Sequence, residues 1–259
     1  MSNLWMDFEE WQYMLQWNME KEMLYWYAEQ NYNGSGITDL LDENNQPIIV
    51  GPGLLSQIPN KATYSTLTSN KLKSLVRDVF FGMTDAQDKV ITLFTGTGGA
   101  DEFDKAMKAE LSSNAFRQSD NNVFATGSGR SMTSTGFFTT YEHVDGYTVR
   151  VVRVPIFDHS VVADVAPKHP VSGLPLESYR MVFVDQSTYS GKPNLMMVSR
   201  KGRETIRWGV AGSTIPRGFT GNDLRASDVD GASVHYLKTG HVCLRRFDTS
   251  IDLQCVAGL

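Results

Sequence analysis

The fold is decided by two C-terminal stretches: residues 179–219, YRMVFVDQSTYSGKPNLMMVSRKGRETIRWGVAGSTIPRGF, and residues 228–259, DVDGASVHYLKTGHVCLRRFDTSIDLQCVAGL. Short runs rich in Val, Thr, Phe and Tyr alternate there with Gly, Pro, Asn and Asp, which predicts a succession of short β-strands joined by turns. No cluster of metal ligands, and no nucleophile with its base, stands out among them. The pattern is typical of a protein whose sheet provides shape and contacts with neighbouring molecules.

Size and composition are those of an ordinary globular chain. At 259 residues the chain can bury roughly 70–75% of its extended surface, so a sizeable core is available. No apolar run approaches the ~18 residues that cross a bilayer. The start, MSNLWMDFEEW, lacks the regions of a signal peptide, so we expect no secretion. Cys243 and Cys255 lie in apolar runs and are expected to be buried thiols, a disulfide being the less favoured alternative.

Charge is distributed unevenly along the chain. Residues 1–50 hold nine acidic residues against one basic, a net charge of −8, whereas the remainder holds 23 basic against 20 acidic, a net charge of +3. The acidic segment could therefore attract the basic body, or the same surface of a neighbouring copy. A solvated acidic helix face is the open alternative. No concentrated basic patch occurs, so sequence-independent duplex binding is not expected.

The N-terminal segment predicts an amphipathic helix over residues 3–29. Apolar residues recur there at steps of three and four with acidic residues between them: Leu4, Phe8, Trp11, Leu15, Met19, Met23 and Trp26. The helix either packs on the chain's own body or docks as an arm on another subunit, and the sequence leaves both open. A membrane-surface helix is not expected, since anionic lipid would repel the acidic face.

Two further elements follow. Residues 37–58 predict a hairpin or protruding loop, with turn chemistry from Asn44, Asn45 and Pro47. A second amphipathic helix over 69–83, capped by Thr68 or Ser69, buries the stripe Leu72, Leu75, Val76, Val79, Phe80 and Met83.

Residues 90–135 predict a strand over 90–94, a glycine turn, a helix over 101–111 and then a mobile or partner-ordered loop over 112–135. The strand, glycine turn and helix have the layout of a phosphate cradle but lack its Lys-Ser/Thr pair. We place Asp101, Glu102 and Asp104 in the first helical turn, where they would repel phosphate. No nucleotide or other cofactor is predicted.

Four potential metal ligands lie within twelve residues: Asp158, His159, Asp164 and His169. Their spacing matches no metal-ligand pattern, and the chain has no G-x-S-x-G nucleophile elbow. The remaining histidines, His143, His235 and His241, are expected on strands or at the surface. We therefore predict no metal site and no catalytic residue, and the protein is expected not to be an enzyme.

Several stretches together resemble the major capsid proteins of tailed bacteriophages, in particular those of crAss-like phages of gut Bacteroidetes. They are GPGLLSQIPN (51–60), YSTLTSNKLKSLVRDVFFGM (64–83), ITLFTGTGGADEFDKAM (91–107) and the block from Met181 to Phe219. The resemblance extends from about residue 47 to the end. Members of that group tend to be longer, so this chain resembles a shortened relative or a C-terminal portion. No Lys–Asn cross-linking pair can be placed.

The resemblance implies an α+β protein of the Hong Kong 97-type fold. Residues 1–36 would be an N-terminal helical arm and residues 37–60 an extended hairpin loop. Residues 61–259 would form a peripheral domain, with its spine helix at 69–83, and an axial domain.

The implied function is that of a structural virion protein. Copies would assemble in the bacterial host cytoplasm into pentamers and hexamers of an icosahedral capsid around the phage DNA, which they would contact only non-specifically. Portal or decoration proteins are further implied partners, and no membrane is. We expect the subunit-interface anchors to be Trp5, Trp11, Trp17 and Trp26. The alternatives are a β-rich tail or decoration binding module, and a hydrolase using the Asp158–His159 region.

Overall fold

A computed structural model describes residues 2–31, 38, 40–41, 43–47, 50–80, 89–113, 123–125, 131–133, 140–142, 148–211 and 232–257. The chain divides into two compact units, each described here by itself. Unit 1 comprises Met1–Ser56 and Met196–Cys243, and unit 2 comprises Gln57–Leu195 and Leu244–Leu259. The described part of the chain includes no helix that is long and apolar enough to span a membrane.

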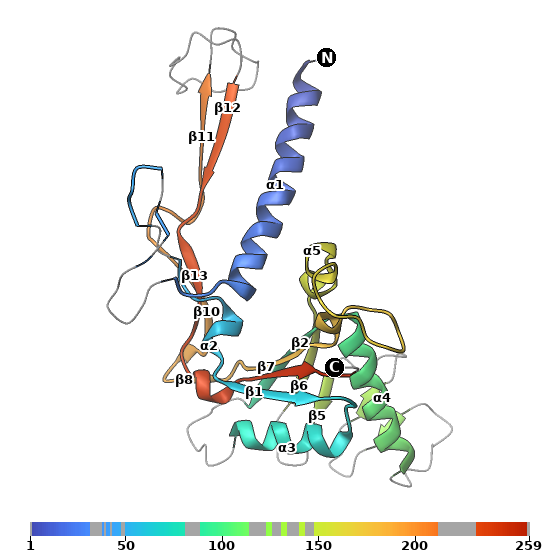
Figure 1. The fold of residues 1–259 in the computed structure, drawn as a ribbon. Coiled ribbons are helices and arrows are strands. Elements are labelled where there is room, and N and C mark those ends of the chain that lie inside the picture. The colour runs from blue at the N-terminus through green and yellow to red at the C-terminus, as the bar shows by residue number, and fades with distance from the viewer. Residues whose placement is uncertain are drawn as a thin grey trace. The chain divides into compact units, whose positions relative to one another are not determined.

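Unit 2 is built on a six-stranded mixed sheet (Figure 1). The strands, in spatial order, are β1 (Asn60–Tyr64), β14 (Ile251–Cys255), β7 (Met181–Asp185), β2 (Val90–Thr95), β6 (Thr148–Arg153) and β5 (Thr140–Glu142). β1 pairs with β14 in parallel, as β2 does with β6, whereas β7 is antiparallel to both β14 and β2. The strands β1, β14, β2 and β6 therefore run in one direction and share one carboxyl end.

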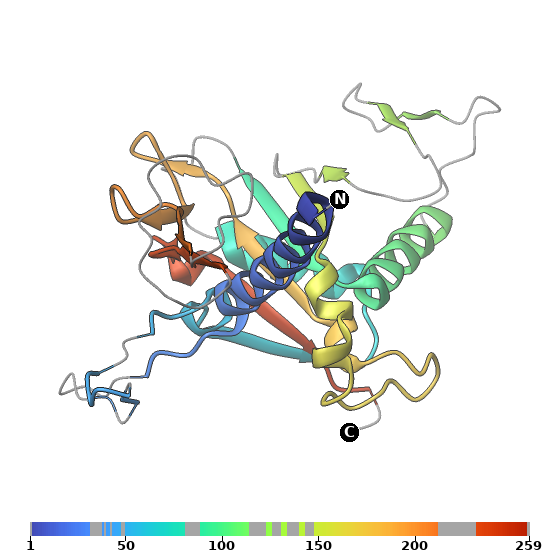
Figure 2. The ribbon, with the colours of Figure 1, turned by 90° about the horizontal axis from the view of Figure 1, so that it is seen from above.

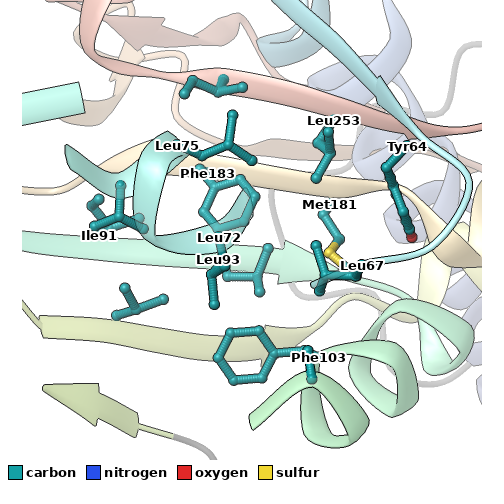
Figure 3. Packing of buried hydrophobic residues seen from close by; sticks show 14 of the residues in the cluster. Tyr64, Leu67, Leu72, Leu75, Ile91, Leu93, Phe103, Met181, Phe183 and Leu253 are labelled. Atoms are coloured by element: carbon teal, nitrogen blue, oxygen red, sulfur yellow. The ribbon is translucent and has the colours of Figure 1, made fainter. Parts of the chain in front are cut away.

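Two helices bury their apolar faces in the core of this sheet. They are α3 (Ser69–Phe80) and α4 (Thr97–Ser113). Figure 3 shows Leu72 and Leu75 of α3 and Phe103 of α4 among the side chains of the strands. The Lys71 N–H donates to Thr68 Oγ1 at 3.3 Å, so Thr68 caps α3. The helix predicted from residue 69 is confirmed up to Phe80, and 81–83 lie outside the described residues.

A buried ion pair ties the sheet to the segment before β7. Arg180 donates from Nε and Nη2 to the two carboxylate oxygens of Asp252, at 2.8 and 2.6 Å, and from Nη1 to Glu177 at 2.5 Å. The Asp252 side chain is fully buried. Because each carboxylate oxygen of Asp252 meets a guanidinium N–H, the bidentate geometry offsets the desolvation of both charges.

The connection from β6 to β7 is a succession of short helices. These are η1 (Pro155–Asp158), α5 (Ser160–Ala163) and η2 (Leu176–Tyr179). After β7 in the sequence, the strands β8 (Thr188–Tyr189) and β9 (Lys192–Pro193) form a short pair. The 3₁₀ helix η3 (Phe247–Thr249) precedes β14. The Tyr64 hydroxyl donates to the Tyr179 carbonyl, which fixes η2 to the end of β1.

Unit 1 contains the long helix α1 (Ser2–Tyr27) and two pairs of strands. The pairs are β11 (Ile206–Ala211) with β12 (Ala232–Leu237), and β10 (Leu195–Ser199) with β13 (Gly240–Leu244); α2 (Leu54–Gln57) lies at the unit boundary. The helix predicted over 3–29 is thus confirmed. The predicted turn is also present, because Leu41 bridges to Pro47 and Asn45 has a φ of 58°.

One prediction for the loop over 112–135 was wrong in part. Helix α4 continues to Ser113, and β3 (Val123–Ala125) pairs with β4 (Ser131–Thr133) in an antiparallel register. Val123 and Phe124 have high β propensity, which the Ser- and Asn-rich surroundings masked in the sequence. The rest of that segment, and His143, lie outside the described residues. Cys243 and Cys255 are free thiols, the first half-buried and the second buried, and burial raises the pKa of Cys255.

Candidate assembly surface

Helix α1 and the β11–β12 hairpin belong to the same unit (Figure 1), and a charged cluster joins them. Arg207 of β11 donates from Nε and Nη2 to the two carboxylate oxygens of Glu10, at 2.7 and 3.0 Å. The Tyr236 hydroxyl of β12 donates to the same carboxylate. The hydrogen bond from Arg207, and next that from Tyr236, hold the pKa of Glu10 below its ordinary value. Glu10 is therefore ionised at neutral pH and anchors the helix.

Aromatic side chains continue this contact along the same face of α1. The rings of Tyr13 and Trp17 lie 5.8 and 5.4 Å from that of Tyr236. Lys21 places its ammonium 3.7 Å from the Trp17 ring centroid, a cation–π contact. Residues 10, 13, 17 and 21 recur at helical spacing, so one face of α1 is occupied by its own hairpin.

The apolar stripe predicted from the sequence lies on the opposite face of α1. Phe8, Trp11 and Leu15 are 52%, 55% and 51% exposed, and the rings of Phe8 and Trp11 lie 5.8 Å apart. At 3.6 residues per turn, residue 8 lies roughly 200° around the helix from residue 10. Docking on the hairpin therefore leaves the stripe Phe8, Trp11 and Leu15 exposed to solvent.

The C-terminal end of α1 is held by the last part of the predicted loop region, residues 53–56. Gly53 N–H and Ser56 Oγ both donate to the Ala28 carbonyl, at 2.7 and 3.0 Å. A Cβ on Gly53 would lie 2.7 Å from Ala28 N and 2.8 Å from Trp26 O, so only glycine permits this approach. The base of α1 is thus fixed as firmly as its middle.

The glycine turn that resembled a phosphate cradle is filled by a carboxylate of the chain itself. The N–H of Thr97 donates to both Asp158 oxygens, at 3.1 and 3.0 Å, and Thr97 Oγ1 donates to Oδ2 at 2.7 Å. Ser178 Oγ donates to the other oxygen at 2.5 Å and accepts from Gly98 N–H at 2.9 Å. An anion already lies at the positive end of α4.

The predicted position of the acidic residues in this helix was wrong. Helix α4 begins at Thr97, so Asp101, Glu102 and Asp104 lie beyond its first turn. The helix begins at Thr97 because Asp158 and Ser178 accept from the N–H groups of Thr97 and Gly98. Gly98 lets Tyr179 pack against this first turn, since an added Cβ would lie 2.6 Å from its ring. Asp158 has no local sequence signal as the capping group, because it lies 61 residues away from Thr97.

Three of the four potential metal ligands make hydrogen bonds within the fold through their side chains. Asp158 caps α4, and His159 Nδ1 accepts from the Val161 N–H at 3.3 Å. His169 Nδ1 accepts from the Val171 and Ser172 N–H groups, and its ring stacks on Tyr179 at 4.5 Å. In the part of the chain that the structure describes, no group of three His, Cys, Asp or Glu residues is placed to hold a metal ion.

Comparison with protein families gives the identity. The family model described as Crassvirus major capsid protein matches residues 1–257. This chain belongs to that family. Over 255 residues it is 26% identical to the "Major capsid protein" of Bacteroides phage crAss001, covering 94% of this chain and 49% of the relative. The chain therefore spans about half the length of that curated relative.

Two solved capsid structures are similar to a lower degree. The capsid of an empty GTA particle is 11% identical, with a TM-score of 0.37 over 97% of this chain and 73% of that one. The capsid of cyanophage P-SCSP1u is 12% identical, with a TM-score of 0.38 over 78% of this chain and 56% of that one. The family assignment rests on the match of the family model.

In this member of the Crassvirus capsid family, the four candidate tryptophans have different environments. Trp11 is exposed, Trp17 packs on its own hairpin and Trp26 is half-buried near Gly53. The side chain of Trp5 lies outside the described residues. Trp11 is thus the candidate best placed to meet another molecule, and Phe8 and Leu15, which the site prediction omitted, accompany it.

Proposed function

We propose that this chain is a structural subunit of a phage capsid and assembles with copies of itself into pentamers and hexamers of an icosahedral shell. Membership of the Crassvirus capsid family supports this function. The observation that carries it is the exposed stripe of Phe8, Trp11 and Leu15 on a helix that is fixed from behind. The virion is then its location, and packaged DNA a non-specific neighbour.

The stripe is suited to bind a neighbouring subunit. Removing a large apolar side chain from water contributes about 1.5–3 kcal/mol. Because Glu10, Tyr13 and Trp17 already hold the helix, a neighbour that binds the opposite face has little ordering entropy to overcome. Helix α1 can then contact its own hairpin and another subunit at the same time, because the two contacts use opposite faces of the helix.

The finer architecture is part of the same proposal. Residues 1–36 would serve as the arm, 37–60 as the extended loop and 61–259 as peripheral and axial domains of a Hong Kong 97-type subunit. The amphipathic helix from Ser69 would be the spine helix, and α1 the arm helix. Such obligate interfaces typically bury more than ~2,000 Å² in total. Portal or decoration proteins would be additional partners.

The test is assembly of the full chain after substitution of Trp11. Trp11→Ala combined with Phe8→Ala should leave the melting temperature nearly unchanged, because both side chains are exposed, and should raise the concentration needed for assembly by about tenfold or more. Negative-stain electron microscopy and light scattering over a concentration series measure this. Gln12→Ala, a polar exposed position on the same helix, is the matched control.

Two outcomes would contradict the proposal. Unchanged assembly of the Trp11 and Phe8 variant would show that the stripe is not an interface. A parent chain that remains a monomer or small trimer at every concentration, yet binds a glycan or another virion component saturably, would favour the tail or decoration module instead.

A further inference from the structure

A second surface, in unit 2, carries side chains that a solvated loop would not be expected to expose. The connection from α5 to η2 includes residues 165–174, VAPKHPVSGL, here called the valine loop. Val165 and Val171 are 87% and 89% exposed, more than any other large apolar side chain in the described part of the chain. Figure 2 shows the loop, in gold, extending away from the sheet.

The valine loop is nevertheless held in one conformation. The His169 N–H donates to the Leu174 carbonyl at 2.7 Å, and the Gly173 N–H, at a φ of +72°, donates to the His169 carbonyl at 2.9 Å. The Tyr179 hydroxyl donates to Ser172 Oγ at 2.7 Å. A loop that is already rigid loses little entropy when it binds, so it can present valines to a partner at low cost.

A groove elsewhere in unit 2 has the complementary properties. It has a volume of about 330 Å³ and lies beside the edge strand β1. Its walls are apolar side chains from β1, α3 and β14, and its rim is polar: Ala62, Leu75, Val79 and Ile251 form the walls, and Asn60, Lys61, Asp78 and Asp248 the rim. We call this the β1 groove.

The charges of the two surfaces are of opposite sign. Lys168 is the only Asp, Glu, Lys or Arg residue in the valine loop, which gives the loop a charge of +1 with neutral histidine. The groove rim has Asp78 and Asp248 against Lys61, a net charge of −1. Among the described residues, none pairs with the side chains of Lys168, Asp78 or Asp248. Apolar walls and opposite charge both match the loop to the groove.

The valine loop is anchored in its own chain at the end of β1 that lies away from the β1 groove. The valine loop leaves from the carboxyl end of β6 and returns to the start of β7, whose Met181 is opposite Thr95 and Leu253. The β1 groove is lined by the amino ends of β1 and β14, at Asn60 and Ile251. Asn60 and Ile251 are level with each other and two residues, about 7 Å, from the level of Met181. Tyr179, which holds the loop through Ser172, binds Tyr64 at the other end of β1, four residues or about 13 Å from Asn60.

We propose that the valine loop of one copy binds in the β1 groove of the next copy. This inference rests on the proposed function, which supplies identical neighbours. Because the two surfaces differ, the contact is head-to-tail, and head-to-tail contacts close into rings when the rotation between copies permits. Val171 enters the groove between β1 and α3, and Lys168 meets the rim carboxylates Asp78 and Asp248.

Disulfide cross-linking of assembled particles tests the contact directly. In a Cys243→Ser background, Val171→Cys with Lys61→Cys should give a ladder of dimers, trimers and larger species on a non-reducing gel. A mixture of the two single variants should stop at dimers, since each copy then holds one of the two thiols. Both positions are exposed, so folding should be unaffected. The control pair, Val171→Cys with Lys108→Cys on α4, should give no ladder.

A charge exchange gives an independent readout. Lys168→Glu should weaken association about fivefold, the upper end for an exposed ion pair. Adding Asp78→Lys should restore association, because each copy then carries the reversed pair.

The outcomes separate this inference from the function on which it rests. Particles that form without a Val171–Lys61 ladder would overturn the head-to-tail contact and leave the capsid function intact. Dimers from Val171→Cys alone would also overturn it, since the loops would then meet each other. A chain that forms no particles or oligomers at any concentration would contradict the capsid function, and the contact with it.

Discussion

The helices α1 and α3 are both amphipathic, but they place their apolar stripes in opposite environments. In α3, Leu72 and Val76 are almost completely buried against the sheet of unit 2. In α1, Trp11 and Leu15 are exposed, while the half-buried Glu10 and Trp17 contact the hairpin of unit 1. The difference teaches that an apolar stripe predicts a helix and a buried face, but does not tell which molecule buries that face.

The largest loss of stability is expected from breaking the buried ion pair between Arg180 and Asp252 in unit 2. Arg180→Ala leaves the fully buried carboxylate of Asp252 without its guanidinium partner and should lower the free energy of unfolding by about 3–5 kcal/mol. Urea denaturation followed by circular dichroism measures the change. Lys105→Ala, which removes an exposed partner of Glu102, should change stability by less than about 1 kcal/mol. Equal effects would contradict the buried pair.

The comparison of the two helices is tested most sharply by two leucines. Leu72→Ala should cost about 2–5 kcal/mol of unfolding free energy, because it leaves a cavity in the core. Leu15→Ala should cost within about 0.5 kcal/mol and yet impair assembly. A large loss of stability from Leu15→Ala in unassembled subunits would show that the chain itself buries the α1 stripe.

A smaller loss of stability is expected at Gly53, where the chain packs against the C-terminal end of α1. Gly53→Ala forces a Cβ against the Ala28 and Trp26 backbone and should cost about 1–3 kcal/mol locally. Hydrogen exchange of residues 24–28 should rise in this variant. Gly191→Ala serves as a control for backbone strain without a steric clash. The φ of Gly191 is +72°, which an alanine rarely adopts, and no atom lies within 4 Å of the added Cβ. Unchanged exchange in Gly53→Ala would contradict the close approach.

The smallest expected effect is the pH dependence of the contact between Glu10 and Arg207. The pKa of Glu10 is lowered from its ordinary 4.5, first by the hydrogen bond from Arg207. Its stabilising contribution is therefore complete above about pH 4.5 and is lost as pH falls through the lower, folded-state pKa. The contact should be worth about 0.2–1 kcal/mol, because Arg207 is exposed.

Tryptophan fluorescence between pH 3 and 7 follows this transition, since Trp17 lies on Tyr236 beside the carboxylate. Glu10→Gln should abolish the change, and Glu22→Gln, an exposed acid on the same helix, should retain it. A transition that persists in Glu10→Gln would have another origin.

Local patterns predicted much of the fold. The periodicity of Leu72, Leu75, Val76 and Val79 predicted α3, and Asn44, Asn45 and Pro47 predicted the turn in the loop. Contacts between distant residues could not be predicted in this way. Asp158 caps a helix that begins 61 residues earlier, and Glu10 binds Arg207 at a separation of 197 residues. The residues next to Asp158 and Glu10 do not indicate these contacts, because the sequence around an acidic residue does not show whether its side chain is solvated or paired.

For the candidate assembly surface, the sequence predicted the helix α1 but not which of its aromatic residues are exposed. The stripe on residues 3–29 was found from its spacing, but tryptophan identity alone could not separate Trp11, which is exposed, from Trp17, which packs on Tyr236. Their positions differ by six residues, which is 600° or about 240° around the helix. The face, and not the residue type, decides which tryptophan is available to a partner.

Hydroxyl-radical footprinting of subunits and assembled particles tests the central claim most directly. Oxidation of Trp11 and Phe8 should be high in unassembled subunits and should fall at least about tenfold on assembly, whereas that of Trp17, half-buried against Tyr236, should change little. Equal oxidation of Trp11 in subunits and particles would contradict the claim that a neighbouring copy covers the exposed stripe of α1.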